Sequence, residues 1–208
     1  YLLFLYLFFH SQTTWTRMHT SKGSLKVVVA GPQNSGKTSL VDFVSDLSRI
    51  EIGTKDRSYD ATVGCRIVEY DVDGRRVELW DVAGDHKYES CWPAILQGLT
   101  LPTSGSSGGA GASTASSSQD ESKVNGVILV YDPDRPNHEG EIGLWYDHFV
   151  RIPGISDDRC IIFVHTKDPR VSFRSRLPTK MSRCKVHSTT YSMTDEVRQY
   201  FSDFIHRL

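Results

Sequence analysis

The octapeptide Gly31-Pro-Gln-Asn-Ser-Gly36-Lys37-Thr38 constrains the fold more than any other feature of the chain. It matches the pattern G-x-x-x-x-G-K-S/T, it follows an apolar run over 25–30, and apolar residues at helical spacing come after it. A glycine-rich loop between a buried strand and a helix turns its backbone N–H groups toward a phosphate at the positive end of the helix. The pattern therefore predicts a phosphate-binding loop in an α/β domain.

Each residue type in this loop has a chemical reason to be there. We expect Lys37 to reach the β- and γ-phosphates of a nucleotide and the Thr38 hydroxyl to ligate Mg²⁺. A phosphate loop alone does not choose between a kinase, an ATPase and a GTPase. The loop residues that we expect to contact nucleotide are Gly31, Gln33, Asn34, Ser35, Gly36, Lys37, Thr38 and Ser39.

Strand and helix patterns alternate along the rest of the chain. Predicted helices cover 36–48, a segment that begins just after Pro136, and the residues up to Leu208; predicted strands cover 25–30, 65–72, 75–80, 126–131, 160–164 and 184–188. Asp73-Gly74 is a strong signal for a hairpin turn. The expected fold class is therefore α/β, with a mostly parallel six-stranded sheet, one antiparallel edge hairpin, and helices on both faces.

Two stretches fall outside this pattern. The apolar run over 1–9 is too short for a membrane span, which needs about 20 residues. We expect 1–23 to be an N-terminal extension outside the fold, with 1–17 lying upstream of a true start at Met18. Residues 103–118 are all Gly, Ser, Ala or Thr, which predicts a flexible insertion over 101–123. The expected organisation is one domain over 24–208 that this insertion interrupts.

The charge balance and the cysteine content indicate which kinds of partner and modification the chain is expected to lack. The 24 Lys and Arg nearly balance the 25 Asp and Glu, which excludes a strongly basic surface for nucleic acid or membrane lipids, so no nucleic-acid partner is expected. Cys65, Cys91, Cys160 and Cys184 lack metal-ligand spacing and are interpreted as reduced thiols of a cytosolic protein. The terminal Ile-His-Arg-Leu208 contains no cysteine, so neither prenylation nor a direct membrane anchor is expected.

Two further segments resemble the switch regions of Ras-like GTPases. Tyr59-Asp-Ala-Thr62-Val-Gly64 resembles switch I of Rab-type members, and Trp80-Asp81-Val-Ala-Gly84 resembles the W-D-x-A-G opening of switch II. The resemblance implies Mg²⁺ ligation by Thr62, a metal contact of Asp81 through water, and a γ-phosphate contact of the Gly84 N–H. It also implies GTP or GDP and Mg²⁺ as cofactors, with Thr38, Thr62 and Asp81 at the metal. A threonine before a strand is also simply a good strand former.

The resemblance narrows to one family. Glu78-Leu-Trp-Asp81, Gly84-Asp85, Glu89-Ser-Cys-Trp-Pro-Ala94 and Leu144-Trp-Tyr146 resemble the Rab-like GTPase subunit of the intraflagellar transport B complex, the Rab-like protein five family. The likeness runs from 25 to 208, apart from the insertion. It implies a Ras-like P-loop G domain, guanine-nucleotide binding, docking on coiled-coil subunits of that complex, and a location in the cytoplasm and in the cilium or flagellum, including its base.

Three departures from the Ras-like pattern bear on mechanism. Asp85 stands where active enzymes carry the glutamine that orients water, and Gln33 stands where they usually carry glycine. We therefore expect weak or absent hydrolysis and assign no catalytic residue. His165-Thr-Lys-Asp168 replaces Asn-Lys-x-Asp, so Asp168 is either the base-reading carboxylate or a turn residue before a proline. The segment Ser188-Thr-Thr190, which begins at the last residue of the sixth predicted strand, is the candidate for the loop that contacts the guanine oxygen.

Several alternatives stay open. The chain could be an active switching GTPase of vesicle or flagellar traffic that borrows catalytic groups from a partner, a G domain with a vestigial nucleotide, or a P-loop kinase for a small molecule. His86 and His165 are either acid–base groups or bystanders. Trp92, Trp145 and Tyr146 are either a docking surface or core aromatics. The helix that Ras-like domains place over 171–183 is expected to be short or missing.

Overall fold

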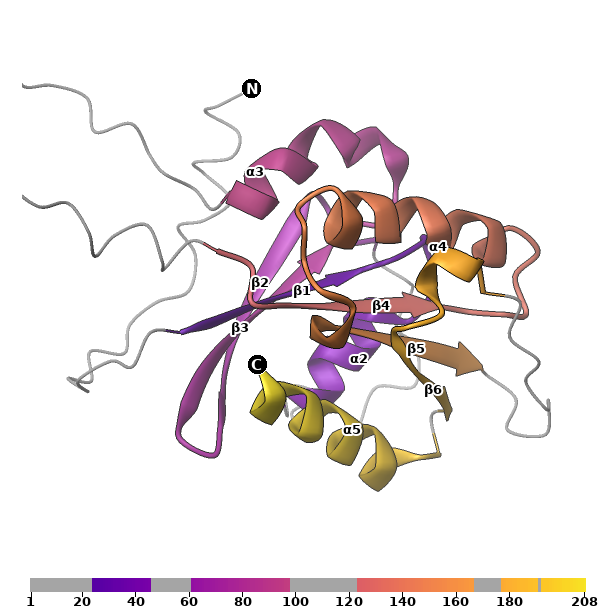
Figure 1. Cartoon of the computed structure of the whole chain (residues 1–208). Coiled ribbons are helices and arrows are strands. Elements are labelled where there is room, and N and C mark those ends of the chain that lie inside the picture. Colours follow the sequence, from indigo (N-terminus) through magenta and orange to yellow (C-terminus); the bar gives the residue numbers. More distant parts are fainter. Residues whose placement is uncertain (1–23, 46–60, 98–122, 167–176, 191) are drawn as a thin grey trace, which may run out of the picture.

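A six-stranded mixed sheet forms the centre of the computed structural model, which describes residues 24–45, 61–97, 123–166, 177–190 and 192–208. The strand order is β2-β3-β1-β4-β5-β6, and only β2 and β3 pair antiparallel (Figure 1). This confirms the predicted fold class. The strands are β1 (Leu25–Ala30), β2 (Cys65–Val72), β3 (Arg75–Val82), β4 (Gly126–Tyr131), β5 (Cys160–Thr166) and β6 (Lys185–Thr190).

The hairpin between β2 and β3 turns where the sequence predicts it. Asp73 and Gly74 both have positive φ, 49° and 82°, which is the conformation of the two-residue turns that match the twist of paired strands. A two-residue turn fixes the register of the whole hairpin, and this register places Arg66 opposite Asp81. The hairpin therefore positions a cation beside a residue of the expected metal site.

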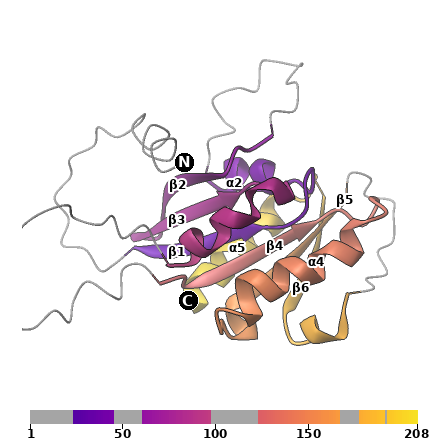
Figure 2. The same ribbon diagram turned by 90° about the horizontal axis from the view of Figure 1, so that it is seen from above.

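Helices cover both faces of the sheet. Helices α3 (Trp92–Gln97) and α4 (His138–Tyr146) lie on one face, while α2 (Lys37–Val44) and α5 (Thr194–Arg207) lie on the other (Figures 1 and 2). A 3-10 helix, η2 (His86–Cys91), precedes α3, and a π-helical turn, η3 (Asp147–Arg151), continues α4; shorter 3-10 turns are η4 (Asp157–Arg159) and η5 (Thr179–Met181).

The two faces of the sheet bury separate cores. Along β1, Val28 and Ala30 belong to the cluster under α3 and α4, whereas Val27 and Val29 belong to the cluster over α2 and α5. This alternation follows from the two-residue period of a strand, and burial on both faces explains why the run is continuously apolar. The phosphate loop thus leaves the sheet from a fully buried strand.

An aromatic cluster fixes α3 against α4. The rings of Trp92 and Trp145 lie 4.6 Å apart and those of Trp92 and Phe149 5.2 Å apart, and all three side chains are buried. Tyr146 is buried as well. The docking-surface interpretation of Trp92, Trp145 and Tyr146 is therefore wrong, because these rings build the core that holds the helix after the switch II motif.

The remaining sequence-based predictions concern Ser188, the helix expected over 171–183, and the segments outside the sheet. The expectation that Ser188 begins a loop is wrong: Ser188 lies within β6 and pairs with Val164, because β6 continues to Thr190. Within the described part of 171–183, the helical structure is the single turn η5. The extension at 1–23, Asp168, and the insertion apart from Lys123 lie outside the described residues. None of the described helices combines the length and apolar character that a membrane span requires.

Candidate functional site

The phosphate loop adopts the tight backbone course that its glycines predict. Gly31 has φ 146°, and a Cβ there would lie 2.1 Å from the carbonyl oxygen of Val130, so no other residue fits. Gly36 has φ 92° and leads directly into α2, whose first residue is Lys37. The loop therefore joins the end of β1 to the N-terminus of a helix, as phosphate binding requires.

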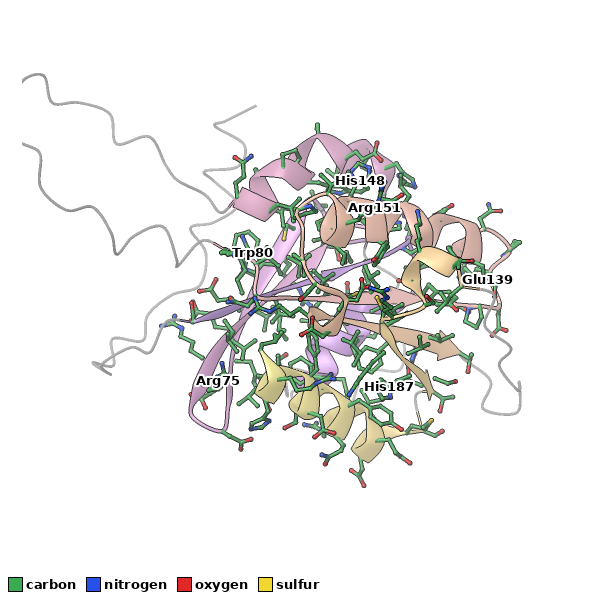
Figure 3. All side chains as sticks on the ribbon, in the orientation of Figure 1. Arg75, Trp80, Glu139, His148, Arg151 and His187 are labelled. Atoms are coloured by element: carbon green, nitrogen blue, oxygen red, sulfur yellow. The ribbon has the colours of Figure 1, made fainter. Side chains whose placement is uncertain are left out.

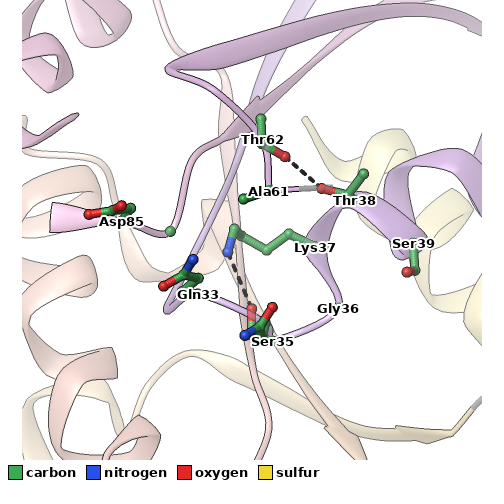
Figure 4. A pocket seen from close by; sticks show the side chains of 11 residues that line it. Gln33, Ser35, Gly36, Lys37, Thr38, Ser39, Ala61, Thr62 and Asp85 are labelled. Carbon is green, nitrogen blue, oxygen red and sulfur yellow. Dashed lines mark hydrogen bonds between the residues drawn. The ribbon is translucent and has the colours of Figure 1, made fainter. Parts of the chain in front are cut away.

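Lys37 occupies the centre of this loop. Its side chain is buried, and its ammonium donates hydrogen bonds to the carbonyls of Gly31 and Pro32 at 2.8 Å and 2.6 Å. Figure 4 shows the side chain running across the pocket, with Ser35 beneath it. Burial lowers the pKa of Lys37 to about 8, and the nearby Asp81 carboxylate partly opposes that effect. The loop thus wraps around a cation.

Three oxygen-bearing side chains meet beside the lysine. The Thr38 hydroxyl donates to Asp81 Oδ2 at 2.8 Å and lies 2.9 Å from the Thr62 hydroxyl (Figure 4). The three residues come from α2, β3 and the segment before β2, which converge at one edge of the sheet. The structure therefore brings together all three residues that the resemblance assigns to the metal.

Asp81 is fully buried beside the Arg66 guanidinium, whose Nη2 lies 3.3 Å from Asp81 Oδ2. Burial raises the pKa of Asp81, while the Thr38 hydrogen bond and Arg66 act against it. Its Oδ1 has no hydrogen-bond partner among the described residues. A buried carboxylate oxygen without a partner beside two hydroxyls suits a hard cation such as Mg²⁺, so the residues present fit the implied metal.

One pocket collects most of the predicted nucleotide contacts. It is lined by residues 33–39, Ala61, Thr62, Gly84 and Asp85 (Figure 4). Gly31 and Asp81 do not line the pocket themselves, but each accepts a hydrogen bond from a residue that does. The Gly31 carbonyl accepts from Lys37, and the Asp81 carboxylate accepts from Thr38. Sequence reasoning missed Ala61 and Arg66, although the hairpin turn already places Arg66 opposite Asp81. The motif residues therefore form one continuous site.

Gly84 and Asp85 close one side of the pocket in different ways. A Cβ on Gly84 would lie 2.5 Å from Gln33 N, so this residue packs directly on the phosphate loop. The Asp85 carboxylate accepts from Lys87 N at 3.0 Å, pairs with Lys87 Nζ at 2.8 Å, and is directed away from Lys37 (Figure 4). These bonds to Lys87 hold the pKa of Asp85 below its usual range. Asp85 thus begins η2 as its N-cap.

The opposite side of the loop rests on β5 and β6. A Cβ on Gly36 would lie 2.9 Å from the His165 ring, and His165 Nδ1 lies 3.2 Å from the Thr189 hydroxyl. His165 therefore packs the phosphate loop against β6. His86, the other histidine considered for acid–base chemistry, lies 3.5 Å from Glu89 and 3.8 Å from Glu141, and it does not line the pocket around Lys37.

Comparison with known proteins agrees with this geometry. No family model matches the chain. An intraflagellar transport protein 22 homologue of Danio rerio is 31% identical over 87% of this chain and 88% of its own length. The GTP-bound crystal structure of the T. brucei IFT22/74/81 complex aligns with a TM-score of 0.63 and 25% identity over 89% of this chain and 95% of that one. GDP-bound T. brucei IFT22 shares the fold, with a TM-score of 0.57 and 20% identity over 89% and 96%.

The likeness to the Danio rerio homologue extends over most of both chains. The loop, the buried aspartate at the end of β3 and the six-stranded sheet are all in place. The chain therefore belongs to the intraflagellar transport protein 22 family of Rab-like small GTPases.

Proposed function

We propose that this chain binds GTP or GDP with Mg²⁺ in the pocket around Lys37. The observation that carries the proposal is the ammonium of Lys37 at the centre of a glycine-shaped loop, beside the Thr38–Asp81 hydrogen bond. The backbone N–H groups of residues 31–39 and the Lys37 ammonium would bind the phosphates. Thr38 and Thr62 would ligate the cation directly and Asp81 through water. Bound Mg²⁺ would neutralise charge on the β- and γ-phosphates.

Guanine recognition is a finer part of this proposal. The GTP- and GDP-bound crystal structures of T. brucei IFT22 support guanine as the base. Asp168 would read the base from beyond the end of β5. The backbone around Ser188 would have to reach the base from within β6, and it lies one strand residue before Thr189, which contacts His165. A base at the carboxyl ends of β5 and β6 follows the general rule for parallel sheets.

Hydrolysis is proposed to be weak. The Asp85 carboxylate is bound by Lys87 at the start of η2, so it is not available to orient an attacking water. A carboxylate would also add negative charge near the γ-phosphate, and the exposed Gln33 side chain occupies the pocket mouth that a partner's arginine would enter. Loss of these two contributions removes several powers of ten from the rate of a Ras-like enzyme.

The chain is further proposed to dock on coiled-coil subunits of the intraflagellar transport B complex, in the cytoplasm and in the cilium or flagellum. The T. brucei complex of IFT22 with 74 and 81 supports such partners. Within this chain, η2 and α3 follow the switch II motif directly. A γ-phosphate contact at Gly84 would therefore alter the position of the surface that η2 and α3 form. The nucleotide would thereby set the shape that the partner recognises.

The test combines three measurements on the purified chain. Chromatography of the released ligand identifies the bound nucleotide, a single-turnover assay with Mg²⁺ measures hydrolysis, and a pull-down measures capture of the chain's own 74 and 81 partners. Lys37→Ala should abolish nucleotide binding, whereas Lys180→Ala, which alters a surface ion pair with Asp147, should not. Adenine nucleotide in the pocket, or phosphate transfer to an acceptor other than water, would favour the kinase instead. Turnover at the rate of an active switching enzyme would refute weak hydrolysis.

A further inference from the structure

Arg66 in β2 lies between the carboxylates of two other elements. Its Nη2 lies 2.7 Å from Asp42 Oδ1, on α2, and 3.3 Å from Asp81 Oδ2, on β3. The antiparallel register of β2 and β3 sets Arg66 directly opposite Asp81, so the two side chains project from the same face of the sheet. One guanidinium therefore contacts a carboxylate of the expected metal site and a second carboxylate outside that site.

Attraction between charges, rather than hydrogen-bond geometry, holds the buried end of this guanidinium. Within the part of the chain that the structure describes, Arg66 Nε and Nη2 make no hydrogen bond, and neither do Asp42 Oδ1 and Asp81 Oδ1. The Asp81 side chain is fully buried, whereas 37% of the Arg66 side chain is exposed. The contacts of Nη2 with the two carboxylates are therefore ion pairs, whose strength depends on the other charges around them.

A divalent cation beside Thr38 would change those charges. Asp81 has the partnerless oxygen that suits Mg²⁺, so the metal and the guanidinium would be attracted to the same carboxylate and would repel each other. Until a metal binds, Arg66 offsets the cost of a charged carboxylate in the protein interior. Asp42 offers Arg66 an alternative partner once the metal takes its place beside Asp81.

We propose that Arg66 is a resident counter-ion of Asp81 that competes with Mg²⁺ for its carboxylate, while Asp42 draws the guanidinium away and so favours the metal. The proposal rests on the proposed binding of GDP or GTP with Mg²⁺. In this role Arg66 acts through Asp81 and touches neither the nucleotide nor the metal, so it is a positioning residue. The Asp42–Arg66 pair would thus set the Mg²⁺ concentration at which the site retains its nucleotide.

Two substitutions in this cluster should change the Mg²⁺ requirement in opposite directions. Arg66→Gln removes the counter-ion, and Asp42→Asn removes the carboxylate that competes for it; neither residue lines the pocket around Lys37. Arg76→Gln, the matched control, removes the same charge from an exposed ion pair with Glu69. Release of a fluorescent GDP analogue over a series of buffered Mg²⁺ concentrations gives the concentration for half-maximal retention. Urea unfolding without Mg²⁺ gives the stability of each variant.

We expect Arg66→Gln to lower this Mg²⁺ concentration by about three- to ten-fold and Asp42→Asn to raise it by a similar factor, a modest effect because solvent screens a partly exposed guanidinium. Arg76→Gln should leave it unchanged. A purely structural role would instead lower the stability of both cluster variants and shift their Mg²⁺ requirement in the same direction or not at all.

Unchanged requirements, shifts in one direction, or the reverse of both shifts would overturn the inference alone. Should Arg66→Gln fail to fold, Asp42→Asn decides by itself, since a requirement that does not rise would overturn the inference. Failure of the unaltered protein to retain GDP at any Mg²⁺ concentration would overturn the proposed function as well.

Discussion

Replacing Gly84 by alanine tests how closely switch II packs on the phosphate loop. The new Cβ would lie 2.5 Å from Gln33 N and 2.6 Å from both Gln33 Cα and Pro32 C. All three neighbours are backbone atoms, so no side chain can rotate away. Since ordinary contact begins near 3.4 Å, the two segments must separate by roughly 1 Å.

Overpacking of this kind costs about 1–3 kcal/mol, which corresponds to about five-fold to 150-fold in an equilibrium constant. We expect Gly84→Ala to lower the free energy of unfolding by that amount in the nucleotide-free protein. If the γ-phosphate draws Gly84 toward the loop, as proposed, the variant should also lose GTP affinity by a larger factor than GDP affinity. Urea unfolding measures the first effect and titration calorimetry the second.

Gly140 provides a matched control within the same chain. It lies in α4, and a Cβ there would meet nothing within 4 Å. Gly140→Ala should therefore stabilise the protein by about 0.5–1 kcal/mol, the gain from glycine to alanine in a helix. Unchanged stability and unchanged GTP preference in Gly84→Ala, beside a normal Gly140→Ala, would refute the close packing of switch II on the loop.

Three further perturbations have defined outcomes. Lys26 is buried, and its ammonium lies 3.8 Å from the centre of the Trp80 ring; Trp80 is labelled in Figure 3. Because burial lowers the pKa of Lys26 from 10.5 to about 8, the unfolded state binds more protons between these values. The free energy of unfolding should therefore rise by at most about 3 kcal/mol as the pH increases from 8 to 10.5, an increment that urea unfolding should no longer find in Lys26→Met. Trp145→Ala should lower the free energy of unfolding by about 3–5 kcal/mol, because the ring is fully buried against Trp92; a loss below 1 kcal/mol would contradict the aromatic anchor. Asp85→Gln should remove the side-chain cap of η2, lower stability slightly and raise single-turnover GTP hydrolysis, and a lower rate would argue that Asp85 itself assists the reaction.

Local patterns were enough to predict the sheet and the phosphate loop. The apolar runs of β1 and β4 and the glycines of the loop act over a few residues, so their structure follows from the adjacent sequence. The Asp73-Gly74 turn even fixes the distant pairing of Arg66 with Asp81, because register propagates along a hairpin. The position of Arg66 beside Asp81 in the expected metal site could therefore be predicted from the sequence.

Features that depend on packing between distant segments were not predictable. The apolar pattern predicts a strand that ends at residue 164, yet β5 continues through His165 and Thr166, which pair with Thr189 and Thr190. Residues 165, 166, 189 and 190 are all polar, and the His165 ring lies against the phosphate loop at Gly36, so the apolar pattern stops before the strand pairing does. Gln33 and His138 line one pocket although they lie far apart in the sequence, and no local signal reveals this.

Direct titration of the nucleotide-stripped protein tests the central claim. Calorimetry with GDP, GTP and ATP in the presence of Mg²⁺ compares the unaltered chain with Lys37→Ala, which lacks the ammonium that binds the carbonyls of Gly31 and Pro32. The account predicts one site that binds GDP and GTP, prefers both to ATP, and is lost in the variant. Equal binding of guanine nucleotides to both proteins, or binding to neither, would contradict it.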